Sequence, residues 1–110
     1  MSTPGKNEAA QPAIRAEEIP EGGAKMIRIA DEEVAVFKRS GVLCAIANIC
    51  PHEGGQLSKG WLEGDEVVCP IHGYRFHLRT GVCSTDQGLK AKTFEVSKYG
   101  EGFKINLATK

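Results

Sequence analysis

The chain has 110 residues, enough for one small domain with a modest core. It carries 14 Lys and Arg against 14 Asp and Glu, so its formal charge is zero, which argues against nucleic acid as a partner. No apolar run approaches the roughly 18 residues that cross a bilayer, and no signal peptide opens the chain. We therefore expect a single domain over residues 1–110 that has no membrane contact and works in the cytoplasm.

Short alternating segments separated by Gly-rich turns predict an all-β fold. In chain order, the expected strands are 24–30, 34–38, 42–47, 66–69, 92–97 and 103–107. The last two are joined by a hairpin turn at 99–102. Only residues 16–21 suggest a helical turn, and residues 1–12, which are small and polar, are expected to form a loose tail.

Two histidines stand just downstream of cysteines. Cys50 and His52 form a C-x-H motif, and Cys69 and His72 form a C-x-x-H motif, with 16 residues between His52 and Cys69. Two thiolates and two imidazoles from two short loops suit either zinc or an iron–sulfur site. One Cys and one His from each loop is the donor set of a [2Fe–2S] centre in which two His replace two Cys at one iron. A zinc-stabilised interaction module, or ordinary core residues without metal, are the alternatives.

The two loop segments CPHEGGQL (50–57) and CPIHGYRF (69–76) resemble the Rieske motif, and we identify the chain as similar to Rieske-type ferredoxins. The resemblance implies one [2Fe–2S] cluster per chain. It places Cys50 and Cys69 on the inner iron, and His52 and His72 on the outer iron, with their far ring edges reaching the surface.

The same resemblance implies the domain layout. An antiparallel β-sandwich base is expected from residues 13–48 and 84–107, with an inserted cluster-binding subdomain at 49–83.

Residues around the ligands are expected to support the cluster. Gly54, Gly55 and Gly73 allow positive φ and would let backbone amides point at inorganic sulfur. Leu57 and Phe76 are expected to shield the cluster from water.

Other residues near the motif are expected to be structural. Trp61, between the two loops, should have a packing role, and Tyr74 should either line the tip or pack beneath it. His77, at a position where the family often has an acidic residue, should be a solvated strand residue rather than a fifth ligand. Cys44 and Cys83 are expected to be thiols packed in strands.

By the resemblance, the chain is a soluble one-electron carrier without a catalytic centre. It would pass electrons from a flavin-dependent reductase to the terminal oxygenase of a ring-hydroxylating system. Rieske oxygenases also need a mononuclear iron held by two His and one carboxylate, and only His77 remains for such a site. The alternative partner is an assimilatory NAD(P)H nitrite reductase, whose small Rieske subunit the segment 80–86 resembles.

The residues near the motif also predict the reduction potential. High-potential relatives have a disulfide at the positions of Gly55 and Ile71, and hydroxyl groups aimed at cluster and cysteine sulfurs at the positions of Tyr74 and Phe76. Hydrogen bonds to sulfur favour the reduced, more negative cluster. Without them, we expect a potential toward the bottom of the Rieske range.

Overall fold

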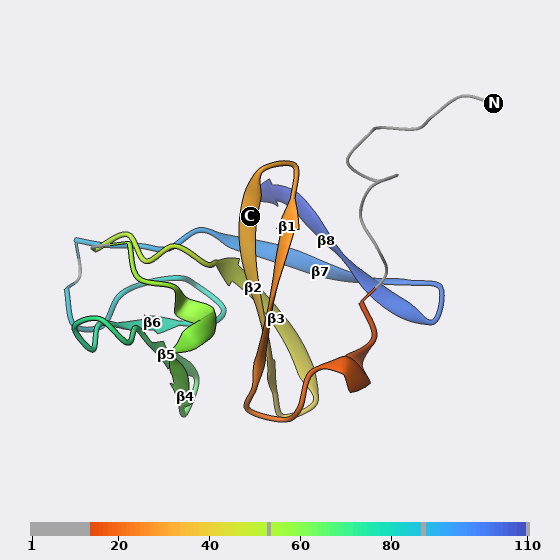
Figure 1. Cartoon of the computed structure of the whole chain (residues 1–110), viewed down its shortest axis with the longest axis horizontal. Coiled ribbons are helices and arrows are strands. Elements are labelled where there is room, and N and C mark those ends of the chain that lie inside the picture. Colours follow the sequence, from red (N-terminus) through yellow and green to blue (C-terminus); the bar gives the residue numbers. More distant parts are fainter. Residues whose placement is uncertain (1–13, 53, 87, 110) are drawn as a thin grey trace.

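Two antiparallel sheets form the framework of the computed structural model, which describes residues 14–52, 54–86 and 88–109. The larger sheet has the order β1-β2-β3-β7-β8, and the smaller has the order β4-β5-β6. Figure 1 shows the small sheet beside one end of the large one. The strands are β1 (Ala24–Ile29), β2 (Glu32–Arg39), β3 (Val42–Ala47), β4 (Trp61–Glu63), β5 (Glu66–Val68), β6 (Arg75–His77), β7 (Thr93–Tyr99) and β8 (Gly102–Thr109).

The predicted all-β class is confirmed. Helical structure in the described residues is limited to two single 3-10 turns, η1 (Ala16–Glu18) and η2 (Leu57–Lys59). The strand predicted at 42–47 has those bounds, and the other five predicted strands differ by at most two residues at either end. Strand β4 was not predicted, because three residues are too few for an alternating pattern to show.

The domain layout is described in part. The predicted tail at 1–12 lies outside the described residues. The small sheet lies within the predicted insertion at 49–83, and the large sheet is built from strands before and after it. The division into base and inserted subdomain stays a prediction of the sequence, and we use the word base for the large sheet alone.

Strands β2 and β3 form a wall between two hydrophobic cores. In β2, Val34 and Val36 belong to a core within the base, while Ala35 and Phe37 belong to a core that extends into the ligand loops. Successive side chains of a strand point to opposite faces, so this alternation buries both faces of β2. The neighbouring pair Ala45 and Ile46 of β3 divides in the same way. The small sheet and the ligand loops therefore pack directly on the base.

The turn between β2 and β3 is held from outside the sheet. Ser40 and Gly41 both have positive φ, 53° and 76°, as a two-residue hairpin turn of right-handed twist requires. The carboxylate of Glu21 accepts hydrogen bonds from both backbone N–H groups. These bonds, that from Gly41 first, lower the pKa of the Glu21 carboxyl below its ordinary value of 4.5.

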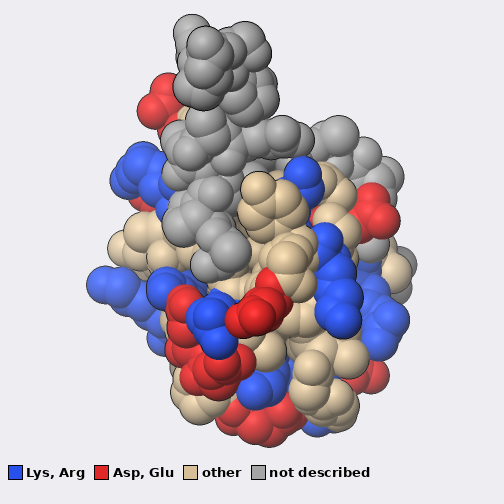
Figure 2. Space-filling model, turned by 90° about the vertical axis from the view of Figure 1, so that its right-hand side faces the viewer, with Lys and Arg blue, Asp and Glu red and all other residues tan. Residues whose placement is uncertain are grey.

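Charge is not segregated on the face of the base that lies furthest from the small sheet. Figure 2 shows basic and acidic side chains interspersed over the described part of this face. In the part of the chain that the structure describes, no helix is long and apolar enough to cross a membrane.

We predict that Glu21→Gln lowers the melting temperature at pH 7, because the amide accepts the two N–H groups less strongly than the carboxylate. Since folding lowers the pKa of Glu21, its contribution is complete above pH 4.5 and is lost as the pH falls through the lower folded-state pKa. Thermal unfolding from pH 7 to pH 3 measures this. Glu101→Gln, at an exposed position in the β7–β8 turn, is the control. A difference from wild type that stays constant down to pH 3 would contradict the assignment.

Candidate metal centre

The first ligand loop is a closed turn that begins at Cys50. Its N–H donates to the carbonyl oxygen of Gly55 at 2.7 Å, and its own carbonyl accepts from the N–H of Gly54 at 2.9 Å. His52 lies within the turn. The chain reaches Cys50 soon after β3 ends, so the large sheet positions this predicted ligand.

The second ligand loop repeats the same turn. The N–H of Cys69 donates to the carbonyl oxygen of Tyr74 at 2.8 Å, and the N–H of Gly73 donates to the carbonyl of Cys69 at 3.0 Å. This loop connects β5 to β6, whose ladder pairs Val68 with Arg75 at its base. The two loops thus have the same backbone plan, with a cysteine first and a glycine fifth.

The fifth position of each turn requires glycine. Gly54 has φ of 79° and Gly73 has φ of 76°, in the left-handed region that side chains other than glycine rarely adopt. The predicted positive φ is confirmed at both positions. The N–H groups of these two glycines donate to the cysteine carbonyls and so close the turns. That backbone amides of the loops point at inorganic sulfur stays a prediction.

The loops face each other across Gly55. A β-carbon placed there would lie 2.3 Å from Cγ1 of Ile71 and 2.9 Å from Sγ of Cys69, closer than real contacts allow. Gly55 therefore permits the close approach of the first loop to a ligand cysteine of the second. The contact also confirms that positions 55 and 71 are opposite each other, as the resemblance implied.

Thiols and imidazoles occupy different depths. Cys50 and Cys69 are each 2% exposed and belong to the same hydrophobic core. His52 is half-buried and His72 is exposed, and their ring centroids are 5.2 Å apart. The Tyr74 ring stacks on His52 at 3.9 Å with an interplanar angle of 10°. The sequence left two places open for Tyr74, and its ring lies on a predicted ligand.

This donor set fits a two-iron cluster. Each loop supplies one soft thiolate at the core and one imidazole toward the surface. Among the described residues, no three His, Cys, Asp or Glu side chains are grouped closely enough to hold a single metal ion. A cluster with two irons takes its protein ligands in pairs, so it needs no such group.

The core beneath the loops is apolar. Leu57 and Phe76, the residues expected to shield the cluster, are both 0% exposed and lie in one core with Cys50 and Cys69. Cys83 is also 0% exposed, and its Sγ is 3.3 Å from the hydroxyl of Thr85. These side chains give Cys50 and Cys69, the predicted ligands, surroundings of low polarity.

The predicted packing role of Trp61 is wrong. Its side chain is 49% exposed, and its indole N–H donates to Oε2 of Glu63 at 3.0 Å. Glu63 also forms an ion pair of 2.6 Å with Arg75 on β6. The Arg75 guanidinium lies 3.8 Å from the carboxylate of Glu66, which is on β5 between β4 and β6. The hydrogen bond from Trp61 and then the Arg75 guanidinium hold the pKa of Glu63 below its ordinary value. Because Trp61 and Glu63 alternate with Leu62 along β4, they lie on its solvent face.

His77 has a structural role in this chain. Its Nδ1 accepts a hydrogen bond from the backbone N–H of Arg79 at 3.1 Å, which closes the turn after β6. The imidazole thereby supplies the acceptor that an acidic residue would supply at this position. His77 lies on β6, so the predicted strand position is confirmed, but its side chain is half-buried rather than solvated. That it is not a fifth ligand stays a prediction.

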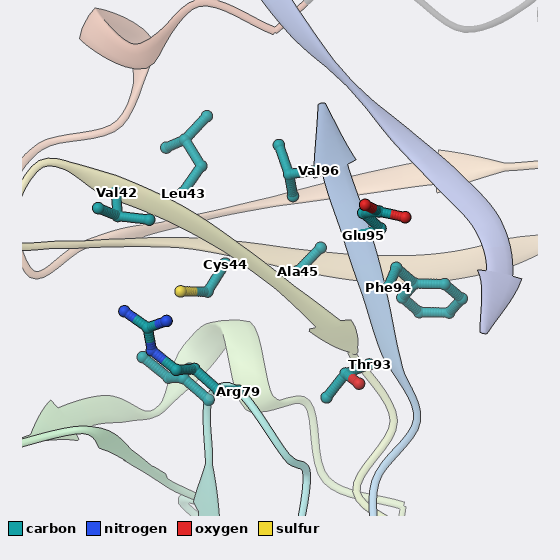
Figure 3. Close-up of a pocket in the computed structure, with 10 residues that line it drawn as sticks. Val42, Leu43, Cys44, Ala45, Arg79, Thr93, Phe94, Glu95 and Val96 are labelled. Atoms are coloured by element: carbon teal, nitrogen blue, oxygen red, sulfur yellow. The ribbon is translucent and has the colours of Figure 1, made fainter. Parts of the chain in front are cut away.

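A pocket of about 260 Å³ lies away from the ligand loops, between β3 and β7 (Figure 3). Its walls include Cys44, Phe94 and Arg79, and the Cys44 sulfur lies on the side of β3 that faces the Arg79 guanidinium. Cys44 is half-buried in its strand, and none of the four cysteines, all within the described residues, forms a disulfide. The pocket contains none of the predicted ligands and is separate from the metal centre.

Comparison with known proteins agrees with this geometry. Residues 9–99 match the model of the Rieske [2Fe-2S] domain, so the chain belongs to the family of Rieske [2Fe–2S] domains, and its cofactor is a [2Fe–2S] cluster. This family membership decides against the zinc module that the sequence alone left open.

Three relatives illustrate the range of the family. The ferredoxin component of a naphthalene 1,2-dioxygenase system from Pseudomonas aeruginosa is 34% identical over 99 residues, which cover 87% of this chain and 93% of the relative. A solved chain from the complex of reduced oxygenase and oxidized ferredoxin in carbazole 1,9a-dioxygenase has a TM-score of 0.81 and 26% identity, covering 89% and 93% of the two chains. An NAD(P)H nitrite reductase from Emericella nidulans is 29% identical over 106 residues, which cover 84% of this chain and 10% of the relative.

We predict that His77→Ala leaves the visible absorbance of the cluster unchanged, because its ring bonds to the backbone of Arg79. The lost acceptor should lower the free energy of unfolding by about 1 kcal/mol. His77→Asp keeps an acceptor at this position and should recover most of that loss. His72→Ala, by contrast, should lose the absorbance. Loss of the cluster in His77→Ala would show that the ligands are misassigned.

Proposed function

We propose that this protein is a one-electron carrier, the ferredoxin of a multicomponent ring-hydroxylating oxygenase. The observation that carries the proposal is the pair of matched ligand loops in a chain that aligns over nearly its whole length with a dioxygenase ferredoxin component. Relatives of this kind are named as ferredoxin components rather than as catalytic enzymes. Any chemical reaction therefore belongs to a partner protein.

Cys50, His52, Cys69 and His72 hold the cluster in this proposal. The bound [2Fe–2S] group supplies a centre that accepts and donates single electrons, and its histidine ligands raise its potential above that of an all-cysteine cluster. The chain's own residues bury the thiolate side of the site and leave His72 at the surface. A partner that contacts this surface comes close to an iron ligand.

We infer both partners from the resemblance to dioxygenase ferredoxins. A flavin-dependent reductase supplies the electrons, and a terminal oxygenase accepts them. The similar solved chain was found in a complex of oxygenase and ferredoxin, which supports an oxygenase as acceptor. We place the protein in the cytoplasm, a reducing compartment in which Cys44 and Cys83 stay as thiols.

The nitrite reductase remains a second candidate, because its Rieske segment aligns with most of this chain. In the structure, Cys83 is buried and contacts Thr85, so packing accounts for this residue and the segment 80–86 favours the nitrite reductase only slightly.

Reconstitution tests the proposal. The purified chain should contain two irons and two acid-labile sulfides. Mixed with the reductase and terminal oxygenase of a naphthalene dioxygenase system lacking its own ferredoxin, it should restore NADH oxidation that depends on the aromatic substrate. His72→Ala is the inactive control. Stoichiometric zinc without sulfide would contradict the cluster, and nitrite-dependent reoxidation of the reduced chain by a nitrite reductase alone would favour the second candidate.

We predict a midpoint potential toward the bottom of the roughly −150 to +300 mV range of Rieske centres. Phe76 is fully buried near the cysteines and has no hydroxyl to donate to sulfur. Phe76→Tyr should raise the midpoint by roughly 40 mV, since a bond ~1 kcal/mol stronger in the reduced state shifts a one-electron couple by about that amount. Voltammetry at pH 7 measures both proteins. A wild-type midpoint above about +150 mV, in the upper half of that range, would contradict the prediction.

A further inference from the structure

Asn48 is the one buried polar or charged side chain among the residues whose burial the structure describes, and it is 0% exposed. Its Nδ2 donates to Oε1 of Glu33 at 3.0 Å and to Oε1 of Gln56 at 3.4 Å. Its Oδ1 accepts from the backbone N–H of Ser58 at 2.8 Å. Burying an amide is unfavourable unless its hydrogen bonds are made, and here they are.

The main chain of Asn48 adds two further bonds. Its N–H donates to the carbonyl of Glu33 at 2.9 Å, and its carbonyl accepts from the N–H of Leu57 at 2.7 Å. The first ligand loop leaves the base just after Asn48 and returns at Leu57. This residue therefore joins both ends of the loop that contains Cys50 and His52.

The second ligand loop is positioned differently. It connects two paired strands, and the pairs Val67 with Phe76 and Val68 with Arg75 close its neck with a backbone ladder. The first loop follows β3 and precedes a 3-10 turn, and a single bridge between Ile49 and Gln56 spans its neck. The buried amide of Asn48 thus helps to close the neck of the first loop, whereas paired strands close the neck of the second.

The amide is anchored to the base sheet. Glu33 lies in β2, and its second carboxylate oxygen accepts from Nη2 of Arg28 at 3.0 Å. Arg28 is opposite Glu33 in the β1–β2 ladder, so this ion pair fixes the carboxylate from the other side. A continuous set of bonds runs from the base through Glu33 and Asn48 to the end of the first loop.

We propose that Asn48 is a positioning residue for the metal centre. Through Glu33 it holds the first ligand loop against the second, and so fixes where Cys50 and His52 meet their partners. The inference rests on the proposed cluster but concerns a residue that is not one of the four proposed ligands. Its effect should therefore be seen in the properties of the bound cluster, beyond the stability of the fold.

Two substitutions that exchange the donor and the acceptor of the hydrogen bond between Asn48 and Glu33 test this role. Asn48→Asp keeps the shape of the side chain and an acceptor for Ser58, but it places a carboxylate oxygen against the Glu33 carboxylate. Glu33→Gln in the same chain supplies an NH₂ group that donates to that oxygen and restores the bond in reverse. Ile105→Val, a truncation in the base core 1% exposed to solvent, is the control for a general loss of stability.

The holoproteins are compared by three measurements: the rate of cluster absorbance loss in excess chelator, the midpoint potential and the electron paramagnetic resonance spectrum of the reduced state. We expect Asn48→Asp to lose its cluster about tenfold faster, which corresponds to ~1.4 kcal/mol. Its spectrum and potential should also shift, because the histidine ligand is reoriented. The double variant should return toward wild type in all three measurements. Ile105→Val should lower the melting temperature without changing the spectrum or the potential.

The proposal is overturned if Asn48→Asp retains the wild-type rate, potential and spectrum, or if Ile105→Val shifts the spectrum equally. If Asn48→Asp does not fold, the double variant decides. A folded double variant with the wild-type spectrum supports the positioning role of Asn48, and a double variant that also fails to fold refutes it. A wild-type protein that binds no [2Fe–2S] cluster would instead refute the proposed function, which separates the two failures.

Discussion

The metal centre depends on two loops, distant in sequence, meeting with no side chain between them. The first loop can approach Cys69 only because position 55 has no β-carbon, which would lie 2.9 Å from the sulfur. That approach lets one loop place its histidine ring 5.2 Å from the ring of the other. Once the loops meet, the thiols lie in an apolar core and the imidazoles toward water, and this arrangement suits an electron carrier.

The same cores explain why the sheet is ordered as it is. Strand β2 is buried on both faces because the base packs on one of them and the ligand loops on the other. The apolar run of β3 has the same cause, with Ala45 and Ile46 in different cores. A loop region that shares its core with the sheet cannot move independently of it. The site is therefore as rigid as the packing beneath it.

The sequence was informative where the signal is local. The ligand motif, the glycine positions and most strands could be predicted, because each depends on a few adjacent residues. Trp61 was misjudged, since its exposure depends on which face of a three-residue strand meets solvent. The bonds by which the N–H groups of Gly54 and Gly73 close the two turns could not be predicted, because a C-x-H motif does not show how its turn is closed. The hydrogen bonds of Asn48 join β2 to the end of the first ligand loop, and no local sequence pattern indicates such a contact.

The large sheet is interrupted along the chain between Ala47, where β3 ends, and Thr93, where β7 begins, although Ile46 pairs with Thr93. For the large sheet, the residues between these two strands form one long loop, and the pairing of β3 with β7 closes it. The entropy of closing a flexible loop grows only with the logarithm of its length, about 0.6 kcal/mol for each doubling. Insertions at an exposed tip of this segment, such as the one at Gly88, therefore add little to the closure entropy of the base. The architecture permits the segment between β3 and β7 to change length while the large sheet stays the same.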